Sequence, residues 1–337
     1  MTVDWFVRAA VGLLPALCFL AGLLLLDSYK LVRLRTVLAV IAAGALVAVA
    51  CYPINLLGMR ASGLPFEAYS RWLAPLVEES LKAAVVVALI RVRRIGFLVD
   101  AAVLGFAVGA GFATVENLYY LNTFDDPHLA TWIVRGFGTA ILHGGVQAIF
   151  AALVLTETDR REALDARAVV PPLLMAVIVH AAFNRFALPP ITETLLVLVS
   201  VPPLLLWVFV RSERVLQRWV GSGFDADQEL LELLGSDEFR HTHAGQYLHA
   251  LRERFPGEVI ADLLCYLHLY VELALRAKGV LIMRENGIEP EIDAETRAKL
   301  AEMQYLERSV GRAGLLTLQP LMHTSRRDLW QLYMLGK

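Results

Sequence analysis

Long apolar stretches constrain this chain more than any other feature of its sequence. A helix that crosses the roughly 30 Å hydrocarbon core of a membrane needs about 20 apolar residues. Seven stretches come close to that length, at residues 6–26, 36–57, 72–90, 95–121, 131–155, 169–188 and 192–210. Hydrophobic residues make up 57% of the 337 residues, which excludes an ordinary soluble protein. We therefore predict an all-α fold, a polytopic transmembrane helical bundle of about seven spans in the lipid bilayer of the cell membrane.

The basic residues between these stretches predict the orientation of the bundle. Cytoplasmic loops of membrane proteins carry an excess of lysine and arginine. Every second connection here has that excess, with Lys30, Arg33 and Arg35, then Arg91, Arg93 and Arg94, then Arg160, Arg161 and Arg167, and finally Arg211, Arg214 and Arg218. This pattern predicts an N-terminus outside the cell and a C-terminus in the cytoplasm.

The character of the sequence changes after residue 211. Charged residues become frequent, and apolar residues recur at helical spacing, as in Leu230, Leu233 and Leu234. We predict two domains, a transmembrane domain at residues 1–211 and a cytoplasmic helical domain at residues 212–337, with a turn at "ENGIEPEID". The charged helix faces of the second domain allow a cytoplasmic protein partner. We expect no nucleic-acid partner.

Four of the predicted spans carry ionisable or amide side chains. The third span has Glu78, Glu79 and Lys82, the fourth has Glu116 and Asn117, the fifth has His143 and Gln147, and the sixth has His180 and Asn184. Such residues are rare in membrane helices and usually face the interior of the bundle. At 1.5 Å of rise per residue, they lie about 8–12 Å from the outer ends of their spans. Because groups on four spans share one depth, we expect them to meet.

The two adjacent glutamates cannot have the same surroundings. Neighbouring residues on a helix diverge by about 100°. One glutamate is therefore expected to face the reacting groups, while the other pairs with Lys82 or holds a histidine. By contrast, His180 and Asn184 are four residues apart and share one helix face.

A carboxylate, two imidazoles and an amide together suit hydrolysis by activated water. Glu78 or Glu79 is expected to act as the general base. His143 and His180 are expected to position the water, Asn184 to stabilise the oxyanion of the tetrahedral intermediate, and Glu116 to orient a histidine or complete the cluster. The set His143, His180 and Glu79 also fits a Zn²⁺ ion with water as its fourth ligand. Because the sequence has no HExxH motif, a metal-free site and a zinc site both remain open.

The order of these motifs resembles that of the PrsW family of intramembrane proteases, which shares a clan with the CAAX prenyl endopeptidases and bacteriocin-processing enzymes. The matching motifs are "EESLK" from Glu78, "GFATVEN" ending at Asn117, the lone His143, and "HAAFN" from His180, within about residues 70–190. Lys82 follows the glutamates more closely than the arginine of the CAAX-type EExxxR, which favours the PrsW branch. The resemblance implies peptide-bond hydrolysis within the membrane, in some members the first cut of a membrane-anchored anti-sigma factor.

We therefore predict an intramembrane endopeptidase, of the glutamate or the metal-dependent type, that cleaves a membrane-anchored protein near its extracytoplasmic side. Two other interpretations use the same residues. Single buried polar groups often make only interhelical hydrogen bonds. A non-enzymatic transporter or signalling protein would also bury ionisable groups, although a transporter is expected to place them at the midplane and to show inverted repeats.

Overall fold

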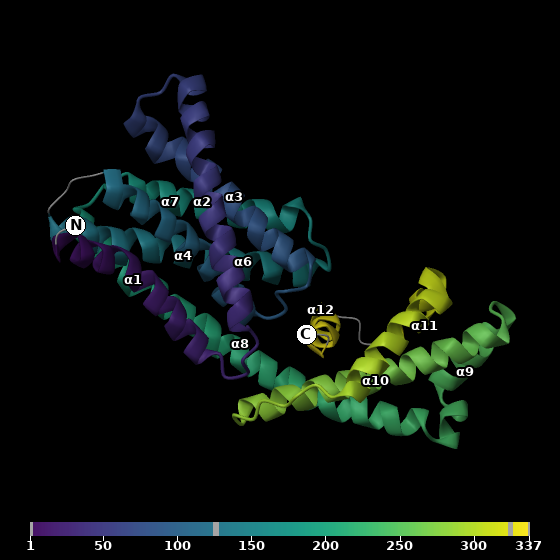
Figure 1. The fold of residues 1–337 in the computed structure, drawn as a ribbon. Helices are drawn as coiled ribbons and strands as arrows, with labels where there is room; N and C mark the ends of the chain where they lie inside the picture. Colours follow the sequence, from purple (N-terminus) through teal and green to yellow (C-terminus); the bar gives the residue numbers. More distant parts are fainter. Residues whose placement is uncertain (1–2, 124–127, 323–325, 336–337) are drawn as a thin grey trace. The chain divides into compact units, whose positions relative to one another are not determined.

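The structure is a computed structural model that describes residues 3–123, 128–322 and 326–335, and this described part is built from helices and loops without strands (Figure 1). The chain divides into two compact units, Met1–Glu213 and Arg214–Lys337.

The first unit is a helical bundle. Its elements are α1 (Val3–Leu26), α2 (Leu34–Ser62), α3 (Phe66–Arg91), α4 (Leu98–Thr123), α5 (Leu129–Ile133), the π-helix η1 (Val134–Ala140), α6 (Ile141–Arg161), α7 (Ala166–Asn184) and the first part of α8 (Pro190–Leu234). α4 packs most extensively against α6 and α2, while α3 packs against α2 and α7. In Figure 1, α4, α6 and α7 lie close together and α2 crosses them.

Among the described residues, six helices are long and apolar enough to cross a membrane: α1, α2, α4, the continuous run Leu129–Arg161, α7 and α8. These helices make the chain a multi-pass membrane protein, as the sequence predicts. The predicted third span, residues 72–90, is helical within α3. It is not counted among the helices apolar enough to cross a membrane, because its middle carries Glu78, Glu79 and Lys82. Six candidate spans thus stand against the seven that the sequence predicts, and α3 accounts for the difference.

α4 forms the core of the bundle. All residues from Val99 to Ala113 are buried, which suits a helix that is apolar all round. Glycines in this segment allow neighbouring backbones to approach. A Cβ on Gly109 would lie 2.1 Å from the carbonyl oxygen of His143, and one on Gly111 would lie 2.0 Å from that of Ile41. Close packing at Gly109 brings α6, with His143, directly against α4, and close packing at Gly111 does the same for α2.

Several helices end away from their predicted limits. α2 continues to Ser62, five residues beyond the predicted end at residue 57, and α7 ends at Asn184 rather than at 188. α8 does not stop near residue 210, because no proline follows Pro203 before the helix ends at Leu234. This single helix therefore passes from the first compact unit into the second.

The second unit is helical around α10 (Gly257–Glu285). α10 packs against α11 (Ala294–Leu318) and α12 (Arg326–Leu335), and the unit also contains η2 (Asp237–His241), α9 (His243–Ala250) and η3 (Leu251–Glu253). Leu263, Leu273 and Leu281 of α10 are fully buried and recur at helical spacing. The predicted turn at "ENGIEPEID" is found between α10 and α11.

Candidate active site

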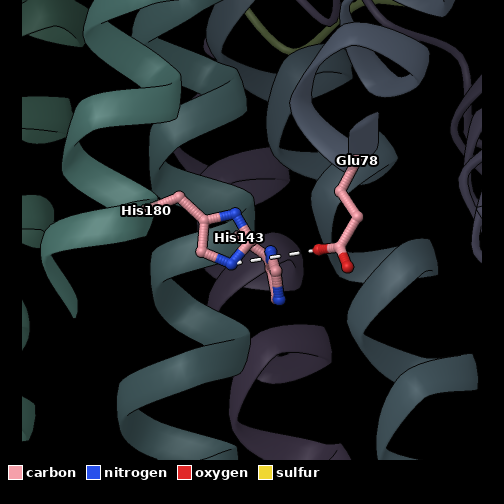
Figure 2. Close-up of side chains that lie close together, drawn as sticks. All are labelled: Glu78, His143 and His180. Carbon is pink, nitrogen blue, oxygen red and sulfur yellow. Dashed lines mark ion pairs between the residues drawn. The ribbon is translucent and has the colours of Figure 1, made fainter. Parts of the chain in front are cut away.

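The polar residues of four helices meet inside the bundle. α3 contributes Glu78 and Glu79, α4 contributes Glu116, α6 contributes His143 and α7 contributes His180. The rings of His143 and His180 stack edge to face, with their centroids 4.7 Å apart. Figure 2 shows these two histidines and Glu78 pointing toward one another from separate helices. Five of the six predicted site residues therefore form one connected cluster.

Glu79 is the fully buried carboxylate of the cluster, and three side chains donate to it. Its Oε1 accepts hydrogen bonds from Lys82 Nζ at 2.5 Å and from His180 Nδ1 at 2.7 Å. Its Oε2 accepts one from Gln147 Nε2 at 2.6 Å. A buried charge is tolerated only when it is paired and hydrogen-bonded, and Glu79 meets both conditions. Both of its oxygens are thus committed to other side chains of the protein.

Lys82 links the buried carboxylate to the second histidine. Its ammonium group is fully buried, donates to His143 Nδ1 at 3.0 Å and lies 4.4 Å from the centre of the Phe112 ring. An ammonium group has no acceptor, so Nδ1 of His143 carries the lone pair and Nε2 carries the proton. That Nε2 lies 3.2 Å from Glu116 Oε2, to which it donates.

Arg135 holds Glu116 from its other side. The guanidinium group lies 3.3 Å from Glu116 Oε2, donates to Asn117 Oδ1 at 2.8 Å and stacks on the Tyr120 ring at 3.7 Å. Arg135 belongs to the π-helix η1, a kind of distortion that is frequent at functional sites. Asn117 in turn donates to the carbonyl oxygen of Gly12 at 2.7 Å. This chain of contacts fixes Glu116 beside His143.

Glu78 differs from its neighbour because it is partly exposed and lightly bound. Its side chain is 13% exposed. Its Oε1 accepts a hydrogen bond from Asn55 Nδ2 at 3.3 Å, and its Oε2 lies 3.9 Å from His180 Nε2, the pair joined by the dashed line in Figure 2. Nδ1 of His180 donates to Glu79, so in the neutral form of the ring Nε2 presents a lone pair. The 3.9 Å between this nitrogen and Glu78 Oε2 is too long for a direct hydrogen bond, and it leaves a gap that suits a water molecule or a cation.

The donor set of this gap fits a metal ion. One ligand atom each from Glu78, His143 and His180 lies within 4.8 Å of the other two. Two histidines and a glutamate are a known ligand set of catalytic zinc. The carboxylate that holds His180 Nδ1 is also the usual second partner of a zinc-binding histidine. His143 would have to exchange Glu116 or Lys82 for the ion, since both of its ring nitrogens have a partner.

The structure groups Glu78 with the histidines, whereas the zinc set predicted from the sequence contained Glu79. The difference has a physical reason. Glu79 is bound by Lys82, Gln147 and Nδ1 of His180, whereas Glu78 lies toward Nε2 of that ring, because adjacent residues diverge around the helix. The sequence shows that the two glutamates must differ, but it does not show which of them lies with both histidines at the gap.

Asn184 lies apart from the cluster in its hydrogen bonding. Its Nδ2 donates to the carbonyl oxygen of Ser70 in α3 at 3.2 Å. In the described part of the chain, no hydrogen bond joins Asn184 to the other predicted site residues. The bond to Ser70 instead ties the end of α7 to the first half of α3.

Three residues around the cluster are not among the predicted site residues. Arg135 contacts Glu116, Asn55 donates to Glu78, and Tyr69 donates to Asn55. Asn55 is the only amide or charged side chain in the predicted second span, which was a usable signal. The predicted end of that span at residue 57 places Asn55 only two residues from the end of the helix. α2 continues to Ser62, so Asn55 lies seven residues from the helix end, about 10 Å at 1.5 Å per residue. That is the depth predicted for Glu78.

Comparison with known families identifies the family of the bundle. The family described as "PrsW family intramembrane metalloprotease" matches residues 32–210, which is more than half of the chain and includes every residue of the cluster. No curated protein and no solved structure matches the chain. With its buried Glu/His cluster carried by a bundle of membrane-length helices, the chain belongs to the PrsW family of intramembrane metalloproteases.

Proposed function

We propose that this protein is an endopeptidase that hydrolyses a peptide bond of a membrane-anchored protein at the cluster of Glu78, His143 and His180. One observation carries the proposal: three side chains from separate helices meet where Glu78 Oε2 and His180 Nε2 face each other at 3.9 Å, without a direct hydrogen bond. Structural polar contacts between membrane helices are normally satisfied directly, as those of Glu79 are. The open gap therefore favours a reacting centre over a structural one.

In this proposal the two glutamates have different roles. Glu78 is the carboxylate at the reacting centre, because Oε2 faces His180 and the side chain is partly exposed. Glu79 is a positioning residue, which accepts the Nδ1 proton of His180 and thereby keeps Nε2 turned toward Glu78. Lys82 balances the charge of Glu79 and fixes the tautomer of His143.

The histidines and Glu78 would hold a divalent metal ion, and Zn²⁺ suits this donor set. Such an ion, when bound, polarises the scissile carbonyl group and makes water a stronger acid. Glu116 would orient His143 through its Nε2 proton. Asn184 uses one amide hydrogen on Ser70, and we assign the other to the oxyanion of the tetrahedral intermediate.

The proposed substrate is a membrane-anchored protein cut near the extracytoplasmic end of its own span. The basic connections between the spans support this side of the membrane. They predict that α3 begins, and that α4 and α7 end, on the side away from the cytoplasm. An anti-sigma factor is one class of substrate with that topology. The same orientation assigns residues 212–337 to a cytoplasmic domain.

The full-length protein, reconstituted in liposomes with a membrane-anchored test substrate, tests this function. Cleavage should be lost in Glu78→Gln and His180→Ala and after treatment with a zinc chelator, and added Zn²⁺ should restore the chelated enzyme. Glu67→Gln is the matched control, since Glu67 lies on the same helix with its side chain 78% exposed. Wild-type cleavage by Glu78→Gln would refute the assignment of the site. Cleavage that resists the chelator but not Glu78→Gln would favour a metal-free glutamate mechanism.

A further inference from the structure

One face of α2 lies against Glu78. Cys51, Asn55 and Gly58 are four and three residues apart, so they share a helix face. Cys51 is buried, and Asn55 and Gly58 are partly buried. On this face Asn55 is the side chain that donates to Glu78.

Tyr69 supports Asn55 from the start of α3. The hydroxyl group of Tyr69 donates to Asn55 Oδ1 at 3.3 Å, and the Tyr69 side chain is 4% exposed. Gly58 makes room for it, because a Cβ at position 58 would lie 2.3 Å from the hydroxyl oxygen. The amide of Asn55 is therefore held with its oxygen toward Tyr69 and its nitrogen toward Glu78.

This arrangement makes the two oxygens of Glu78 different. Oε1 accepts from Asn55, while Oε2 is the atom nearest to His180. A carboxylate that is free to rotate would present either oxygen to the gap. A donor on one oxygen selects one rotamer and leaves the other oxygen for the reacting centre, as second partners of metal-binding carboxylates do.

We propose that Asn55 and Tyr69 form a positioning pair that fixes Glu78 for its role at the reacting centre. This inference rests on the proposed function, since it assigns the outer partners of the same site. The pair acts through Glu78 and touches neither histidine in the described structure. A rival explanation is that the two bonds only tether α2 to α3, in which case they would affect stability and not the chemistry of Glu78.

Zinc binding and cleavage by the purified full-length protein separate these explanations. Asn55→Leu removes the donor to Glu78, and we expect the affinity for Zn²⁺ and kcat to fall about 10- to 100-fold with KM unchanged. Tyr69→Phe removes a single oxygen atom and keeps the ring, so it should fold normally. We expect it to lower both quantities about 3-fold, because Asn55 keeps its donor but loses its support.

Two controls make the test specific. Tyr52→Phe removes a hydroxyl group from α2 at a position that is 58% exposed and keeps the ring that packs against Tyr119, and it should leave zinc affinity and kcat unchanged. In a Glu78→Gln background, Asn55→Leu should cause no further loss of zinc affinity, because the residue through which it acts is already altered. The zinc affinities are measured by competition with a chelator of known affinity, which requires no turnover.

The outcomes distinguish this inference from the proposed function. If Asn55→Leu and Tyr69→Phe bind zinc and cleave like Tyr52→Phe, while Glu78→Gln binds zinc more weakly and does not cleave, the positioning pair is refuted and the site stands. The pair is also refuted if both variants lose only thermal stability. If Glu78→Gln itself binds zinc and cleaves normally, the proposed function fails, and the inference fails with it.

Discussion

Both compact units of the chain gather acidic and basic side chains, but they do so in opposite surroundings. In the bundle, Glu79 and Lys82 pair with no exposed surface. In the second unit, Glu272 contacts both Arg276 and Lys299, and these three side chains are 19%, 30% and 24% exposed. Water can replace a lost partner in the second cluster but not in the first. The buried charges are therefore costly to keep, and we attribute their retention to the proposed reacting centre beside them.

The largest effect is expected from breaking the buried pair. Lys82→Met would leave the charge of Glu79 without its cation, and we expect it to lower the free energy of unfolding by about 3–5 kcal/mol and to abolish cleavage. Adding Glu79→Gln removes both charges, and the double variant should regain most of the stability but no activity. Thermal unfolding in detergent measures the change in stability. A double variant less stable than Lys82→Met would contradict this explanation.

A smaller effect is expected at a buried pair in the second unit. Lys278 is buried, forms an ion pair with Asp227 and lies 5.1 Å from the centre of the Trp219 ring. Lys278→Met should weaken local stability by about 1–3 kcal/mol, since Asp227 is 13% exposed and can regain water. Hydrogen exchange of the full chain should show faster exchange in α10 and no change in α3. Faster exchange in both helices would mean that the bundle and the second unit unfold together.

The smallest effect on stability is expected at the partly exposed cluster of Glu272, Arg276 and Lys299. Glu272→Gln removes the acceptor shared by Arg276 and Lys299, and we expect a loss of at most about 1 kcal/mol, which high salt reduces further. Hydrogen exchange in α10 and α11 at low and high salt measures this loss. Arg297→Gln, which alters an exposed side chain of α11 bonded to the backbone carbonyl of Ile292, provides a control in the same unit.

Acid should reduce the stabilisation that the ionised Glu272 gives to this cluster. Partial burial alone would raise the pKa of Glu272, but hydrogen bonds and charge from Lys299 and Arg276 outweigh it and lower the pKa. The stabilisation is thus complete above the unfolded value of about 4.3 and is lost as pH falls through the lower folded value. Exchange protection of α10 and α11 should therefore decline below about pH 4 in wild type and change less in Glu272→Gln. An equal decline in both proteins would assign the acid sensitivity to other carboxylates.

The sequence predicts much of the bundle and part of the site. Apolar length predicts the helices, and shared depth predicts that Glu116, His143 and His180 meet. The same reasoning could not choose between Glu78 and Glu79, because that choice depends on the rotation of α3 against its neighbours. It also missed Arg135, whose placement depends on the π-helix η1, a change of helical register without a simple sequence signal. Asn184 shares a helix face with His180, but a helix face does not determine which partner a side chain takes.

The most direct test of the site compares initial cleavage rates of Glu78→Gln and Glu67→Gln in liposomes, with zinc supplied in excess. Both substitutions neutralise one glutamate of α3, one at the gap beside His180 and the other on an exposed surface. We predict a rate at least about 1,000-fold below wild type for Glu78→Gln, a loss of roughly 4 kcal/mol of transition-state stabilisation, and a wild-type rate for Glu67→Gln. Equal rates for the two variants would contradict the assignment of Glu78 to the reacting centre.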